Sequence, residues 1–140
     1  MKAVEVKEML YQAVAYLGLS RVYAFFAPTN TIFTNQGTSL PLASQKNTKN
    51  QTRLEAGEEA QIAIFGDQMK GFATKGEPDV RHINKWLVDN CFSDYYTRSS
   101  LDYAERELLT FCYLYSQGGC EPQLKGHIAA NLRLGNDKNL

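Results

Sequence analysis

The segment 99–136 constrains the fold most, because it has the pattern of two consecutive helices joined by a tight turn. Ser99 and Asp102 form an S-x-x-D pattern, which satisfies free backbone N–H groups at a helix start. Gly118-Gly119 can adopt positive φ and end that helix, and Pro122 suits the first turn of the next one. Apolar side chains recur at helical steps in the first half: Leu101, Ala104, Leu108, Phe111, Cys112 and Tyr115. The segment therefore predicts an antiparallel helical hairpin.

The remainder of the chain also has helical periodicity and no pattern of paired strands. The spacing predicts a first helix ending at Gly18 and a second one capped by Ser20, with Pro28 as a kink or an early stop. A third helix is expected over 58–70, and Pro78 should open a fourth. The fourth helix would bury an apolar stripe of Val80, Ile83, Leu87 and Cys91. We therefore predict an all-α fold of about six helices.

The polar stretch 35–56 divides the chain into two helical parts. It is rich in Asn, Gln, Ser, Thr and Lys and has almost no periodicity, which predicts a mobile linker. A helix pair, 1–34, precedes it, and a longer helical region, 57–140, follows it. A length of 140 residues is that of one domain, so we expect the two parts to fold together.

Composition excludes several classes of function. Fifteen basic and fifteen acidic residues balance, and no segment carries a dense basic run, so nucleic-acid or anionic-membrane binding is not indicated. No apolar stretch approaches the roughly 20 residues that span a bilayer. Three cysteines without paired spacing and two distant histidines favour a reducing cytoplasm and argue against a metal site. We expect no cofactor and a cytoplasmic location.

Three residues around the glycine turn are candidates for chemistry. Cys120 lies at the start of a predicted helix, where the partial positive charge favours a thiolate. His127 follows seven residues later, close to two helical turns, and Glu107 lies on the preceding helix. A carboxylate that orients a histidine is a common acid–base arrangement. The structural alternatives stay open: a packed histidine, a solvated glutamate and a small buried cysteine.

The same residues carry a resemblance to a known family. The stretch GGCEPQLKGHIAANLRLGND (118–137), preceded by E-R-E-L (105–108), is similar to the motif of the carboxymuconolactone decarboxylase family, which includes AhpD-like alkylhydroperoxidases. The segment VEVKEMLYQAVAYLGLSRVYAFFAPTN (4–30) resembles the helix pair that normally follows such a histidine helix. The resemblance implies an AhpD-like helical bundle built from the middle part of a tandem-repeat protein.

The resemblance also implies the chemistry. Our first hypothesis is a decarboxylase of a small carboxylated lactone or related oxo-acid, with His127 as proton donor, Glu107 as its orienting partner and Arg106 as a carboxylate clamp. The second is a thiol peroxidase using Cys120, although Gln123 occupies the position of the second cysteine of the peroxidase branch. The third is a non-catalytic helical binding module.

The family forms oligomers, which implies an assembly for this chain. We expect a trimer or hexamer, with the N-terminal helices exchanged between subunits. An 18-residue linker spans roughly 20–25 Å by random-coil scaling, which is enough to reach a neighbour. Apolar side chains at Leu10, Val14, Phe25 and Phe26 would favour such association.

Overall fold

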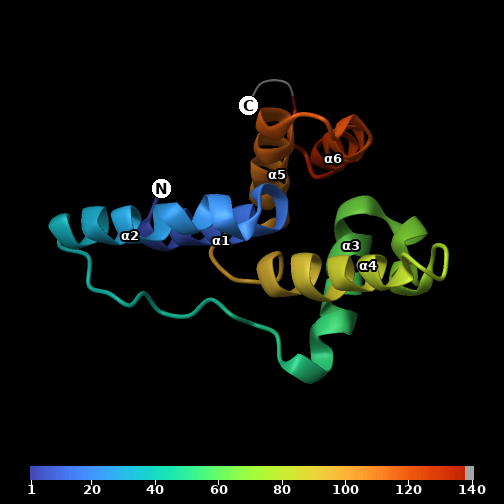
Figure 1. Ribbon diagram of the computed structural model, residues 1–140, viewed down its shortest axis with the longest axis horizontal. Coiled ribbons are helices and arrows are strands. Elements are labelled where there is room, and N and C mark those ends of the chain that lie inside the picture. Colours follow the sequence, from blue (N-terminus) through green and yellow to red (C-terminus); the bar gives the residue numbers. More distant parts are fainter. Residues whose placement is uncertain (138–140) are drawn as a thin grey trace.

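The computed structural model describes residues 1–137, which form helices and no strand, as predicted for an all-α protein. Helices α1 (Ala3–Leu17) and α2 (Leu19–Asn35) form a hairpin that turns at Gly18 and extends away from the remaining helices (Figure 1). The other α-helices are α3 (Arg53–Phe65), α4 (Arg81–Trp86), α5 (Tyr103–Gln117) and α6 (Glu121–Arg133). Single 3₁₀ turns lie at Asn50–Thr52, Asp67–Met69 and Phe72–Thr74. No helix within 1–137 combines the length and apolar character needed to cross a membrane.

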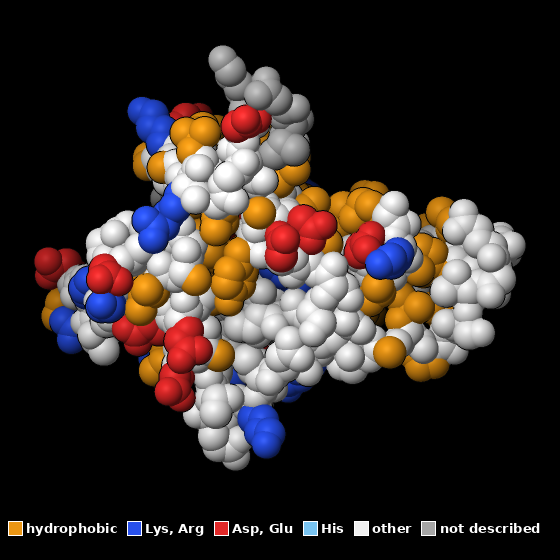
Figure 2. Space-filling model, turned by 180° about the vertical axis from the view of Figure 1, so that it is seen from behind, with side chains coloured by type: hydrophobic (Ala, Val, Ile, Leu, Met, Phe, Trp, Pro, Cys, Tyr) orange, Lys and Arg blue, Asp and Glu red, His pale blue; other side chains and the backbone are white. Residues whose placement is uncertain are grey.

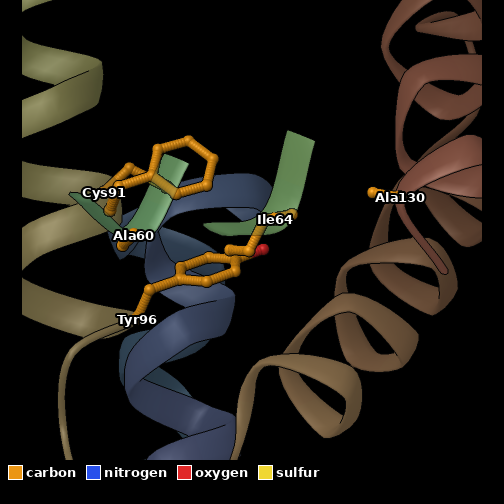
Figure 3. Packing of buried hydrophobic residues seen from close by; sticks show 6 residues of the cluster. Ala60, Ile64, Cys91, Tyr96 and Ala130 are labelled. Carbon is orange, nitrogen blue, oxygen red and sulfur yellow. The ribbon is translucent and has the colours of Figure 1, made fainter. Parts of the chain in front are cut away.

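The hydrophobic core forms where α3 packs against a π-helix, η4 (Leu87–Tyr95), which continues α4. The buried cluster consists of Ala60, Ile64, Cys91, Phe92, Tyr96 and, from α6, Ala130 (Figure 3). Gly57 allows the two backbones to approach, because a Cβ at this position would overlap the carbonyl oxygen of Val88. The π-helix therefore lies directly on α3, and Tyr96 at its end points into the core.

The predicted hairpin in 99–136 is present as α5 and α6. Asp102 is the N-cap of α5: it accepts a hydrogen bond from the Glu105 backbone N–H, and the Glu105 side chain accepts one from the Asp102 N–H. This capping box lies three residues later than the predicted S-x-x-D pattern, which began at Ser99. Gly118 ends α5 with a φ of 68°, as expected.

Several predicted boundaries and one predicted face differ from the structure. Helix α3 begins about five residues before the predicted 58–70. It also ends about five residues early, because Gly66, at a φ of 100°, stops it. Helix α2 runs through Pro28 to Asn35. In the predicted stripe of the fourth helix only Cys91 is buried, whereas Val80, Ile83 and Leu87 are exposed. A π-helix has a wider turn than an α-helix, so residues before and after Leu87 do not share one face.

The linker is held against the helical region by hydrogen bonds. Residues 36–49 run as an extended strap from the end of α2 to the first 3₁₀ turn (Figure 1). The side-chain amide of Asn47 donates to the Thr97 carbonyl at 2.8 Å, and the Ser99 backbone N–H donates to the Gln45 carbonyl at 3.0 Å. The polar composition that predicted a mobile linker therefore supplies the groups that attach it.

The N-terminal hairpin docks through a polar face. Helix α1 lies against α5 and η4, and its buried residues are Lys7, Glu8, Gln12 and Ala13. Leu10 and Val14, whose apolar side chains were expected to favour association, are partly buried. This docking brings polar side chains of α1 to the residues of the α5–α6 hairpin.

Candidate functional site

Glu107 and His127 meet across the α5–α6 hairpin. The distance from His127 Nδ1 to Glu107 Oε2 is 2.6 Å. Glu107 is fully buried, and the His127 side chain is 12% exposed. Asn131 ties the two helices together at this point, because its side-chain amide donates to the Glu107 carbonyl at 3.0 Å and to the His127 carbonyl at 2.8 Å. The pair predicted from the sequence is therefore assembled and rigidly supported.

Tyr96, at the end of the π-helix, forms a hydrogen bond with the other carboxylate oxygen of Glu107. Its hydroxyl donates to Glu107 Oε1 at 2.7 Å. The same hydroxyl lies 2.5 Å from Thr110 Oγ1 and 2.9 Å from the Tyr16 hydroxyl. Burial, reinforced by the negative charge that Tyr16 and Glu107 can carry, raises the pKa of Tyr96 well above its usual value. Tyr96 is therefore a permanent hydrogen-bond donor to Glu107 at neutral pH.

Helix α1 contributes three polar residues that the sequence analysis did not assign to the site. Gln12 is fully buried, and its Nε2 donates to Thr110 Oγ1 at 2.9 Å and to the Arg106 carbonyl at 2.8 Å. Tyr16 bonds Tyr96, and Glu8 bonds Arg106. These three residues follow one another at four-residue steps, so the sequence already placed them on one face of the first helix.

Arg106 lies inside the protein. Its side chain is fully buried, with Nη1 donating to Gln12 Oε1 at 3.0 Å and Nη2 donating to Glu8 Oε2 at 3.3 Å and to the Arg98 carbonyl at 2.9 Å. Arg98 also pairs with Glu8, at 2.8 Å. The predicted role of Arg106 as a clamp for a substrate carboxylate is not retained, because its guanidinium is committed to joining α1 and α5.

The predicted thiol has a hydrogen-bond partner outside the Glu107–His127 pair. Cys120 is the N-cap of α6, as expected, and its Sγ donates to the Leu114 carbonyl at 3.5 Å. Among residues 1–137 no hydrogen bond joins Cys120 to Glu107 or His127. The thiol that adjoins the network is Cys91, whose Sγ donates to the Tyr16 hydroxyl at 3.6 Å. Burial raises the pKa of Cys91 to about 12, which keeps it protonated and unreactive.

Aromatic rings enclose the imidazole of His127. The rings of Phe65 and Tyr16 meet it edge to face, with centroids at 5.3 and 6.0 Å. Tyr16 also lines an open hollow of about 580 Å³ at the α1–α2 turn, with Arg21 and Gln117 on its walls. A small molecule in this hollow would lie beside the ring that covers His127. In the described part of the chain no group of three or more His, Cys, Asp or Glu side chains could hold a metal ion.

The geometry defines a helical protein in which the side chains of Tyr96, Glu107 and His127 form a hydrogen-bonded cluster. In comparisons with known proteins, the chain matches no family model, no curated protein and no solved structure. The chemistry of this protein must therefore be argued from the site itself.

Proposed function

We propose that this chain is an acid–base enzyme of the carboxymuconolactone decarboxylase type, acting on a small carboxylated lactone or related oxo-acid. The observation that carries the proposal is the 2.6 Å contact between His127 Nδ1 and the buried Glu107 carboxylate, whose second oxygen is held by Tyr96. A carboxylate whose second oxygen is held in place orients the imidazole that bonds its first oxygen.

Decarboxylation of such an acid breaks the bond between the carboxylate carbon and its neighbour. Carbon dioxide leaves, and the bonding electron pair stays on the substrate carbon, which must then receive a proton. His127 holds Nδ1 against Glu107, so Nε2 is the nitrogen available to the substrate. In this mechanism protonated His127 delivers the Nε2 proton to the carbanion, becomes neutral and is reprotonated by solvent.

The test is a turnover screen with carboxylated lactones and oxo-acids, measuring carbon dioxide release. Glu107→Gln and His127→Asn should each lower turnover by roughly 10²–10⁴-fold, the usual contribution of a general acid. His82→Asn is the matched control, because His82 is an exposed histidine on α4 and should leave turnover unchanged. In deuterated water the product should carry deuterium at the carbon that lost carbon dioxide.

The same experiment separates the alternatives. Unchanged turnover in folded Glu107→Gln and His127→Asn proteins would show that the mechanism is wrong. Consumption of peroxide that Cys120→Ser abolishes would replace the decarboxylase by a thiol peroxidase. Absence of both activities would leave a helical binding module in which the site is idle.

We also propose that the chain forms a homo-oligomer, a trimer or hexamer. Hydrophobic side chains gather over the α1–α2 hairpin (Figure 2), where the exposed fractions are 59% for Leu19, 69% for Tyr23 and 59% for Phe25. A second exposed apolar group on α4 includes Ile83 and Trp86. Apolar surface of this extent favours association by burial. The α1–α2 hairpin docks on its own chain here, so exchange between subunits is not needed to complete the site.

A further inference from the structure

We propose that Gln12, on helix α1, is a positioning residue that fixes the direction of the hydrogen bonds leading to the Glu107–His127 pair. The proposal rests on the acid–base role of that pair. Gln12 makes no hydrogen bond to either residue within 1–137: it acts through Thr110 and Tyr96, which lie in series between it and the Glu107 carboxylate. In each of these contacts, the group that can donate a proton fixes the direction of the hydrogen bond.

The first step is the orientation of the Gln12 amide. Arg106 Nη1 lies 3.0 Å from one end of this amide, and a guanidinium can only donate. The end facing Arg106 must therefore be the oxygen, Oε1. The other end is Nε2, and both of its protons are used, toward Thr110 Oγ1 and the Arg106 carbonyl. Arg106 thus orients Gln12, and within residues 1–137 its guanidinium makes no hydrogen bond to the Glu107 carboxylate.

The second step is the direction of the Thr110 hydroxyl. A threonine in a helix commonly donates to the carbonyl four residues earlier, which for Thr110 is that of Arg106. That carbonyl already accepts the helical N–H of Thr110 and an N–H of Gln12, so both of its lone pairs are used, and Gln12 also donates to Thr110 Oγ1 itself. The Thr110 proton is therefore directed to the Tyr96 oxygen, 2.5 Å away.

The third step is the direction of the Tyr96 hydroxyl, which contacts the Glu107 carboxylate. The Tyr96 oxygen accepts from Thr110, so its own proton goes to Glu107 Oε1 at 2.7 Å. Tyr16 donates to the same phenol oxygen and accepts from the Cys91 thiol, which leaves the direction unchanged. Glu107 then accepts a hydrogen bond at each carboxylate oxygen, with Nδ1 of His127 as the donor at Oε2.

The titratable and charged groups around the pair are few. The π-helix presents Tyr96 and Cys91, and α1 presents Tyr16 and, further away, Glu8. Helix α5 adds Arg106, and α3 faces the imidazole with the uncharged ring of Phe65. Both phenols and the thiol stay protonated at neutral pH, because burial raises the pKa of each. The strength of the Tyr96 hydrogen bond therefore controls how much negative charge Glu107 presents to His127.

The test replaces Gln12 by the similarly sized but apolar methionine. In Gln12→Met the Arg106 carbonyl loses the Gln12 donor, the Thr110 proton can turn to it, and Tyr96 keeps Tyr16 as its only donor. A weaker hydrogen bond from Tyr96 leaves more charge on Glu107. We expect His127 to bind its second proton at least about threefold more tightly, a rise of roughly 0.5 in the titration midpoint. Nitrogen-15 NMR of the imidazole rings measures it, with His82 as the internal reference.

Thr110→Val is the control, because it removes the hydroxyl that connects Gln12 to Tyr96 without adding charge. The Gln12→Met effect should fall to less than half in the Thr110→Val background. An unchanged midpoint in Gln12→Met, or an equal shift in both backgrounds, would overturn the proposal. If Gln12→Met does not fold, Gln12→Asn replaces it, since its shorter, uncharged amide keeps a polar group beside Arg106 but is one methylene further from Thr110.

This readout needs no substrate, so it separates the two proposals. A midpoint that shifts in a protein without any turnover would support the role of Gln12 and refute the decarboxylase. Turnover that depends on His127, with a midpoint insensitive to Gln12, would support the enzyme and refute the role of Gln12. If both proposals hold, the pH profile of turnover moves by the same amount as the midpoint.

Discussion

Gly57→Ala should destabilise this protein more than a single methyl group ordinarily would. A Cβ at Gly57 would overlap the carbonyl oxygen of Val88 and lie 2.9 Å from its carbonyl carbon and 3.1 Å from its Cγ1. Favourable carbon–carbon contacts begin near ~3.5 Å, and backbone atoms cannot rotate aside. Helix α3 and the π-helix would have to separate by roughly 1 Å at the centre of the core.

The expected loss can be estimated from two opposing effects. Overpacking of a dense core costs about 1–3 kcal/mol, and the upper end applies because the clash involves backbone. Separation of the helices also weakens contacts such as those of Ile64 and Phe92. Alanine in a helix interior stabilises the helix by about 1 kcal/mol relative to glycine, which offsets part of this loss. We expect a net loss of about 2–3 kcal/mol, which lowers the melting temperature by roughly 10 °C for a chain of this size.

Urea unfolding followed by circular dichroism measures this difference, and the chain offers a matched control. Gly126 lies in the interior of α6, and a Cβ there would meet nothing within 4 Å. Gly126→Ala should therefore raise the free energy of unfolding by roughly 0.5–1 kcal/mol. The reasoning about close packing of α3 and the π-helix is refuted if Gly57→Ala is as stable as the parent protein while Gly126→Ala behaves as expected.

Three further predictions follow from the buried groups and the exposed apolar surface. Above pH ~10 a tyrosine in the unfolded chain ionises, whereas buried Tyr96, with its raised pKa, stays protonated. The folded state then binds more protons than the unfolded state, so the free energy of unfolding should fall by about 1.4 kcal/mol per pH unit for this group. Urea midpoints between pH 8 and 11 measure this slope, which Tyr96→Phe should reduce; an equal slope in the variant would contradict the assignment. Iodoacetamide at pH 8 should modify exposed Cys112 first and leave Cys91 intact until the protein unfolds, as followed by peptide mass; early labelling of Cys91 would show that the core opens. Light scattering at micromolar concentration should give a multiple of the 15.8 kDa chain mass, and a monomer mass with cooperative unfolding would rule out the proposed assembly.

The local sequence predicted those parts of the fold that depend on local signals. Gly18 and Gly118 end helices where expected, since both positions need a positive φ. The end of α3 was misplaced because Gly66 and Gly71 both have positive φ and only the first stops the helix. The π-helix was not predicted, since its wider turn depends on packing against Gly57 and has no periodic signal of its own.

The same distinction between local signals and long-range packing applies to the candidate site. Glu107 and His127 could be predicted, because a short turn between two helices fixes which residues face each other. Tyr96 and Gln12 could not be placed, since they come from elements that meet α5 only in the folded protein. The four-residue steps of Glu8, Gln12 and Tyr16 were visible in the sequence, but a polar stripe along a helix is typical of a solvent-exposed face.

The polar face of α1 links docking of the N-terminal hairpin to the chemistry of the site. Little apolar surface of α1 is fully buried, so hydrophobic burial alone specifies its position weakly. Glu8 and Gln12 specify it instead, because a displaced α1 would leave the fully buried Arg106 guanidinium without its carboxylate and amide partners. Removing one partner of a buried charged pair costs more than the intact pair contributes, which makes the docked register well defined. The contacts that attach α1 are also those that orient Thr110, so the hairpin cannot detach without changing the hydrogen bonds at Glu107.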